Sequence, residues 1–147
     1  IALLMISGAV GMLIILGANV KNYMDAASGL FLILFLYSAT IITFGTSGML
    51  KSLSGLKYLF TEEMVGGTQA KYLGKLYGSQ VKFLYGGSFI GLIIGSIAIL
   101  GNIDTYDEFV FLRASAVNLV VLFYAAVLSE GIFRPLSIKL KTCDIKA

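Results

Sequence analysis

Four long apolar blocks with almost no charge constrain this sequence more than any other feature. Residues 2–20, 28–50 and 83–103 contain no charged side chain, and residues 114–133 contain one, Glu130. A helix needs about 20 predominantly apolar residues to cross the hydrocarbon core of a bilayer. The blocks therefore predict an all-α integral membrane protein with four transmembrane helices at about these positions.

The composition removes several classes of chemistry. Of the 147 residues, 58% are hydrophobic and 13% are charged, and histidine is absent. A Ser–His–Asp triad needs histidine, and the single cysteine, Cys143, cannot form a disulfide within the chain. We therefore predict no catalytic residue, no metal site, no cofactor and no enzyme activity, and we expect Cys143 to be a plain thiol.

The spacing of the blocks predicts two helical hairpins in a single membrane domain over residues 1–147. Short polar turns join the first block to the second and the third to the fourth. A longer connector, residues 51–82, joins the two hairpins, and a polar tail, residues 134–147, follows the last block.

The connector itself has helical patterns at both ends. Four leucines recur at helical spacing across its start: Leu50, Leu53, Leu56 and Leu59. Their spacing predicts that the second helix continues beyond the membrane as an amphipathic helix. A second helical pattern, over residues 70–86, leads into the third block.

The basic residues predict the orientation of the chain. Only Lys21 and Arg113 lie in the short turns or at their edges. The other basic residues lie in the connector and the tail: Lys51, Lys57, Lys71, Lys75, Lys82, Arg134, Lys139, Lys141 and Lys146. Because cytoplasmic loops carry the excess of Lys and Arg, the connector and both termini are predicted to be cytoplasmic. These residues flank the apolar blocks, which favours lipid headgroups over nucleic acid as their partner.

A line of glycines runs along the third block: Gly87, Gly91 and Gly95. Small residues let helices approach closely within a membrane, where dispersion contacts stabilise their association. The line therefore predicts a close helix–helix contact, either within this chain's own bundle or with a neighbouring chain. Ser7, Gly8 and Gly11 form a weaker version on the first block.

Polar side chains within the blocks are few. Glu130 lies near the predicted cytoplasmic end of the fourth block, and Arg134 follows one turn later, which favours an i,i+4 ion pair over a gate. Ser115, Asn118 and Leu122 share one face of that block. Because an exposed amide is costly in lipid, we expect Asn118 to face protein or water, most simply in a hydrogen bond to an adjacent helix.

Several stretches resemble MotA-type flagellar stator subunits of the MotA/TolQ/ExbB proton channel family. The turn after the first block is similar to the family's Gly-Asn-x-x-x-aromatic-apolar-Asp-x-x-Ser-apolar pattern, with these residues: Ala18, Asn19, Tyr23, Met24, Asp25 and Ser28. The segments SATIITF (residues 38–44) and MLKSLSGLKYLF (residues 49–60) look like the family's second helix and its cytoplasmic continuation. IGSIAILGNID (residues 94–104) is similar to the end of its third helix, and FRPLSIKL (residues 133–140) resembles the exit of its fourth.

The resemblance implies a homopentameric ring in the bacterial inner membrane, around a dimer of a MotB-like partner. The partner's single transmembrane helix would carry the ion-binding Asp, and H⁺ or Na⁺ would be the coupling ion. Residues expected toward this partner or the ion path are Leu92, Ser115, Asn118, Val121 and Leu122. Residues expected at the exit of the fourth helix are Glu130, Arg134 and Pro135.

The chain also departs from the family's pattern. Leu92, Val121 and Leu122 stand where the family usually has threonines, and the connector is much shorter than the family's cytoplasmic domain. A path lined by Leu and Val is poorly suited to ions. An alternative therefore stays open, in which the chain is a non-conducting, four-helix structural or accessory subunit of a larger membrane complex.

Overall fold

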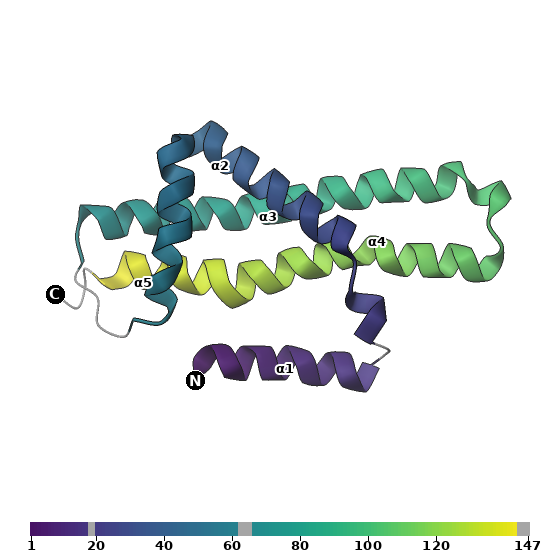
Figure 1. The fold of residues 1–147 in the computed structure, drawn as a ribbon, viewed down its shortest axis with the longest axis horizontal. Coiled ribbons are helices and arrows are strands. Elements are labelled where there is room, and N and C mark those ends of the chain that lie inside the picture. Colours follow the sequence, from purple (N-terminus) through teal and green to yellow (C-terminus); the bar gives the residue numbers. More distant parts are fainter. Residues whose placement is uncertain (18–19, 62–65, 144–147) are drawn as a thin grey trace.

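The frame of the molecule is a pair of long antiparallel helices, the second of which continues into a shorter helix (Figure 1). The computed structural model describes residues 1–17, 20–61 and 66–143. Its α-helices, in chain order, are α1 (Ala2–Gly17), α2 (Ala26–Gly55), α3 (Thr68–Gly101), α4 (Glu108–Leu128) and α5 (Arg134–Thr142). α4 returns beside α3 and leads into α5, while α2 crosses this pair and α1 lies at its edge (Figure 1). The described residues contain no strand.

Three helical stretches are long and apolar enough to cross a membrane: Val20–Leu59, Thr68–Gly101 and Glu108–Thr142. The predicted class, an all-helical protein with membrane-type helices, is confirmed at this level. α1 is also apolar, but its 16 residues rise only about 24 Å, which is less than the ~30 Å hydrocarbon thickness of a bilayer. The number of four spans therefore stays a prediction.

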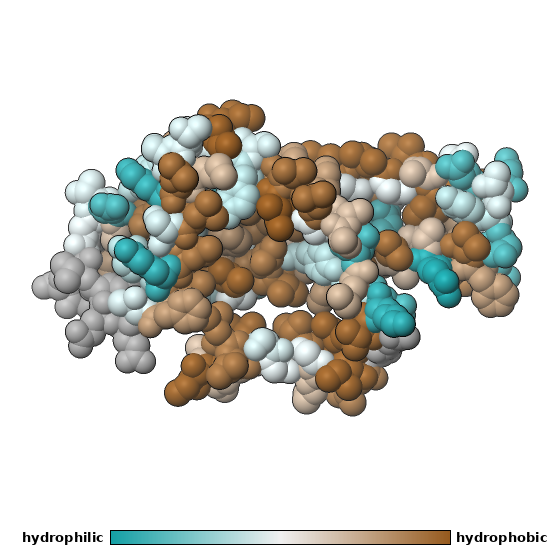
Figure 2. Space-filling model, in the orientation of Figure 1, coloured by the Kyte–Doolittle hydropathy of each residue, from teal (hydrophilic) through white to brown (hydrophobic). Residues whose placement is uncertain are grey.

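The buried core lies where α2, α3 and α5 meet. It is built mainly from leucines on these three helices, together with one tyrosine of α3: Leu32, Leu36, Leu73, Leu76, Leu84, Leu136, Leu140 and Tyr77. Farther along the α3–α4 pair, large apolar side chains are exposed, among them Phe89 and Ile97 of α3 and Phe109 and Leu112 of α4. Figure 2 shows much of the surface in this view as apolar. Exposed apolar surface of this extent is typical of a membrane or partner interface.

α2 is broken at Gly45, inside the predicted second span of residues 28–50. Gly45 has φ 72° and ψ 178°, a conformation that is essentially restricted to glycine. The helix therefore has a first arm, residues 26–44, and a second arm, residues 46–55. In Figure 1 the second arm turns away from the first and crosses α3 and α5.

The second arm packs through small residues. Gly48, Ser52 and Gly55 are its buried residues, and a Cβ on Gly55 would lie 2.5 Å from the hydroxyl of Tyr77. Of the predicted leucine stripe, Leu56 and Leu59 pack against the core, but they lie beyond the arm in a short 3-10 helix (Leu56–Leu59). Leu50 and Leu53 are 65% and 43% exposed. The helical spacing was predicted correctly, but the apolar side of the arm faces away from the protein.

The end of the connector and the third block form one continuous helix, as the pattern over residues 70–86 predicts. α3 begins after Gly67, whose φ is 153°. Beside the first half of α3, a π-helical turn (Ser129–Phe133) joins α4 to α5. Pro135 follows this turn and explains it, because its ring collides with the carbonyl of Gly131 in a regular helix. The wider turn moves that carbonyl away.

Candidate functional site

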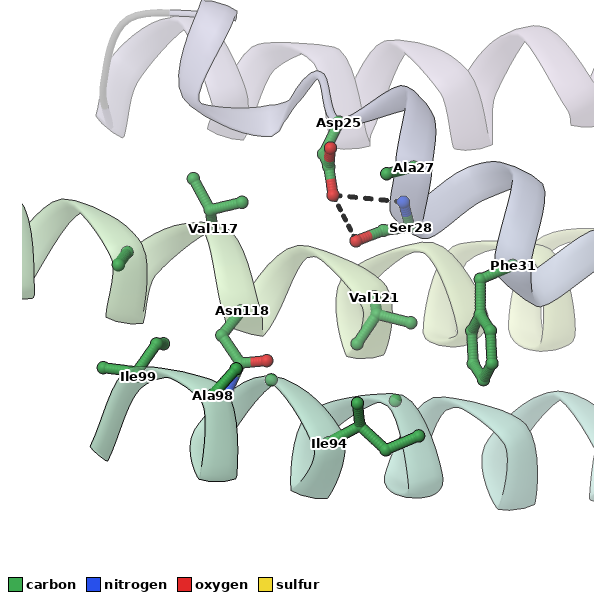
Figure 3. Close-up of a pocket in the computed structure, with 13 residues that line it drawn as sticks. Asp25, Ala27, Ser28, Phe31, Ile94, Ala98, Ile99, Val117, Asn118 and Val121 are labelled. Carbon is green, nitrogen blue, oxygen red and sulfur yellow. Dashed lines mark hydrogen bonds between the residues drawn. The ribbon is translucent and has the colours of Figure 1, made fainter. Parts of the chain in front are cut away.

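Two grooves border the contact between α3 and α4. The first has a volume of about 370 Å³ and lies where the start of α2 meets α3 and α4 (Figure 3). The second has a volume of about 380 Å³ and is lined by α3 and α4 alone. Asn118 and Ile99 line both grooves. Asn118 is the polar residue of the two and is therefore the centre of the candidate site.

Asn118 joins α4 to α3 through its side-chain amide, as the sequence predicts. Its Nδ2 donates to the carbonyl oxygen of Leu92 at 3.1 Å and to Oγ of Ser96 at 3.0 Å. Its Oδ1 lies directly against Gly95, in the space that a Cβ on that glycine would occupy. Figure 3 shows the side chain reaching from α4 to α3. The amide and the glycine together fix how closely the two helices approach.

The glycine line of α3 packs inside this chain: Gly87, Gly91 and Gly95. A Cβ on the first glycine would lie 2.5 Å from the ring of Phe35 in α2. A Cβ on the second would lie 3.0 Å from Phe31 of α2 and 3.2 Å from Val121 of α4, and the third meets Asn118. The sequence left open whether the glycines contact this chain's own helices or a neighbouring chain. Their contacts among the described residues are with helices of the same chain.

The five residues expected toward a partner do not share one surface. Leu92, Ser115 and Asn118 line the second groove. Val121 is 4% exposed and lines the first groove, whereas Leu122 lines neither of the two. The hydroxyl of Ser115 donates to the carbonyl oxygen of Phe111 in its own helix at 2.9 Å. The second groove is therefore apolar apart from Asn118 and hydroxyls already bonded to the backbone.

The helix exit carries the ion pair that its spacing predicts. Arg134 Nη2 lies 3.0 Å from Glu130 Oε1, with both side chains about half exposed. The hydroxyl of Tyr85 on α3 donates to the same carboxylate oxygen at 2.8 Å. Glu130 thus also ties α3 to the π-helical turn, a contact that the sequence did not indicate. Pro135 lies exposed in the first turn of α5.

Asp25 of the resemblance motif begins α2 and lines the first groove. Its carboxylate accepts from the backbone N–H of Ser28 at 3.1 Å and from the Ser28 hydroxyl. Tyr124 of α4 anchors this turn, because its hydroxyl accepts from the backbone N–H of Asp25 at 2.8 Å and donates to the carbonyl oxygen of Tyr23 at 2.6 Å. Ala18 and Asn19 of the same motif lie outside the described residues.

The turn before α2 does not lie level with the loop between α3 and α4, as two equal hairpins would require. It lies partway along the α3–α4 pair. Asp25 shares a groove with Asn118, which is about 15 Å along α4 from its start at Glu108. The loop between α3 and α4 therefore extends beyond the turn between α1 and α2 (Figure 1).

A buried polar cluster was missed by the sequence analysis. Gln80 of α3 donates through Nε2 to Thr40 Oγ1 at 3.1 Å, on the first arm of α2. It also bonds Ser52 of the second arm, whose hydroxyl lies 3.0 Å from Oε1 and 2.8 Å from Nε2. The hydroxyl of Tyr77 donates to the carbonyl oxygen of Ser52. All four side chains are at most 1% exposed. We call them the polar cluster.

The position of Gln80 contained a usable signal. Leu73, Tyr77, Gln80 and Leu84 follow the spacing of one buried helix face. A glutamine at such a position must find partners, because an unpaired buried amide is costly. Among the described residues, no group of three or more His, Cys, Asp or Glu side chains is placed to bind a metal ion.

Comparisons with protein-family models, with curated proteins and with solved structures found no match to this chain.

Proposed function

We propose that this chain is a MotA-like ring subunit of an ion-driven membrane motor. It would cross the bacterial inner membrane four times, with both termini and the connector in the cytoplasm. Five copies would surround a single-span, MotB-like partner, and H⁺ or Na⁺ would be the coupling ion. The observation that carries this proposal is the second groove, where Leu92, Ser115 and Asn118 come together on the α3–α4 pair. These are residues that the resemblance assigns to the partner's side, and among the described helices only α3 and α4 line the groove.

The distribution of charged residues supports an ion-binding site that is supplied by a partner chain. No charged residue lies within 83–103, and Glu130 is already paired with Arg134. An ion that crosses between the helices therefore needs a carboxylate from another chain. The membrane potential supplies about 2.3 kcal/mol per elementary charge per 100 mV, which is the energy that such a motor would use.

The surface of α1 supports assembly with further copies. None of residues 2–16 of α1 is fully buried. A Cβ on Gly8 or Gly11 would meet no atom within 4 Å. Small residues on an uncovered membrane helix favour close contact with another helix. In the proposed ring, that helix belongs to the neighbouring subunit.

The second candidate is a non-conducting accessory subunit. Leu92 and Val121 give the α3–α4 pair apolar side chains at the positions of the expected ion path. Ser96 and Ser115 already donate to backbone carbonyls of their own helices, at 2.8 and 2.9 Å. A chain with this lining would serve assembly through the same surfaces without passing ions.

Ion flux through variants of the second groove tests the motor proposal. A complex isolated from its native membrane would be reconstituted into vesicles that contain a pH-sensitive or Na⁺-sensitive dye. In a conducting ring, Leu92→Thr adds a hydroxyl to the apolar wall and is expected to raise the flux about tenfold, which corresponds to ~1.4 kcal/mol of barrier.

The matched control is Ile93→Thr, at the next position of the same helix. Ile93 is 44% exposed and lines neither groove, so its replacement should leave the flux unchanged. Absence of ion flux from the parent complex and from both variants would favour the accessory role.

A further inference from the structure

The break in α2 sets the depth of this helix in a membrane. Backbone groups left without partners cost several kcal/mol in hydrocarbon, so an interruption belongs where headgroups or water can reach it. Thr40 of the first arm and Ser52 of the second arm both bond Gln80, which lies three residues before the apolar block of residues 83–103. In the proposed orientation this block reaches the cytoplasmic edge of the bilayer near Phe83, so Gly45 falls at that edge and the second arm begins there.

The exposed surface of the second arm has two different flanks. With Ser52 at the centre of the buried face, the 3.6-residue turn places Leu53 and Leu50 together on one flank. Ser47 and Lys51 fall on the opposite flank. A helix with one apolar flank and one polar flank is suited to lie at the boundary between an apolar and a polar environment.

Contacts with α3 establish which way each flank faces. The ammonium group of Lys51 lies 5.1 Å from the centre of the Tyr72 ring. Tyr72 is in the first turns of α3, at the end that carries Lys71 and Lys75. The polar flank therefore faces the basic end of the molecule, and the leucine flank faces the apolar length of α3. Figure 2 shows hydrophilic residues beside the second arm at the left of the view, and apolar surface over the middle.

The arm is held in this position along its length. The polar cluster fixes its middle through Ser52. Beyond its end, the ammonium group of Lys139 on α5 donates to the carbonyl oxygen of Tyr58 at 2.7 Å and to that of Thr61. The flanks therefore keep their orientation relative to α3 and α5.

We propose that the second arm is an interfacial helix that lies in the cytoplasmic surface of the membrane. Leu50 and Leu53 enter the boundary of the acyl chains, and the ammonium groups of Lys51 and Lys57 lie beside lipid phosphates. Lys57 also lies 5.2 Å from the ring of Tyr58, and tyrosines are enriched at this depth of a bilayer. The inference rests on the membrane placement in the proposed function and adds the lipid surface as a partner of the connector.

Single-tryptophan reporters test this inference, because the chain contains no tryptophan. The full chain with Leu53→Trp would be reconstituted into vesicles of phosphatidylcholine and phosphatidylglycerol. Brominated lipids would carry the quencher either high on the acyl chain or deep in the bilayer. We expect the emission of Leu53→Trp to fall by about half or more with shallow bromines, as for a side chain at the acyl boundary, and much less with deep bromines. Leu50→Trp serves as a second reporter on the same flank.

Two controls separate the possible failures. Ser47→Trp, an exposed position on the polar flank of the same arm, should be quenched weakly at either depth. Leu34→Trp, at the middle of the first arm where the side chain is 60% exposed, should be quenched by deep bromines. If Leu34→Trp is quenched and both leucine-flank reporters are not, the interfacial helix is wrong while the membrane placement stands. If Leu34→Trp escapes quenching, the membrane placement is wrong, and the inference falls with it.

Discussion

Replacement of Gly95 by alanine is expected to lower the free energy of unfolding by about 1–3 kcal/mol, the usual cost of overpacking a close contact. The new methyl group would occupy the position of the Asn118 amide oxygen. Asn118 would have to move, and its hydrogen bonds to Leu92 and Ser96 would lengthen or break. Unfolding of the purified chain by denaturant in mixed micelles, followed by circular dichroism, measures the change.

Gly86→Ala is the matched control on the same helix. A Cβ at Gly86 would meet no atom within 4 Å, so alanine should stabilise α3 by up to ~1 kcal/mol through its higher helix propensity. Opposite signs for the two substitutions are the expected result. Equal stabilisation by both would contradict the close approach of α3 and α4 at Gly95.

The polar cluster gives the second large effect. Gln80→Leu keeps the volume of the side chain but removes the bonds to Thr40 and Ser52. Buried polar groups that lose their partners cost roughly 1–3 kcal/mol, and we expect a loss of about 2 kcal/mol in the same unfolding experiment. Because Gln80 bonds both arms of α2, its loss should also loosen the second arm relative to the first.

Gln69→Leu makes the same chemical change about three turns earlier in α3. Gln69 is exposed, so its replacement should change stability by at most ~0.5 kcal/mol. If the two glutamine variants unfold alike, the buried contacts of Gln80 do not hold the arms of α2 together.

The long helices were predictable because their signals are local. An uncharged run long enough to cross a bilayer predicts an apolar helix, and residues 83–101 of the run 83–103 lie in α3 as expected. The break at Gly45 has no comparable signal, since the sequence also carries glycines in unbroken helix, such as Gly87. Periodicity also failed to orient Leu50 and Leu53. It reveals that a helix has an apolar side, but it does not say whether protein or lipid covers that side.

The candidate site was predictable to the same extent. Spacing of one helical turn was enough to pair Glu130 with Arg134. Asn118 was identified because an amide in an apolar helix needs a partner. The contacts of Gln80 join residues far apart in the chain, and nothing in the sequence around it names those partners. Successive helix positions differ by about 100°, which is why Val121 and Leu122 occupy different surfaces although the resemblance groups them.

The most direct test of the proposed ring is the mass of the intact complex. The complex would be isolated from its native membrane without overexpression and weighed by native mass spectrometry. The motor proposal predicts five copies of this chain together with two copies of a single-span partner. One copy among many different subunits would contradict it and would leave the grooves of α3 and α4 as docking surfaces of an accessory protein.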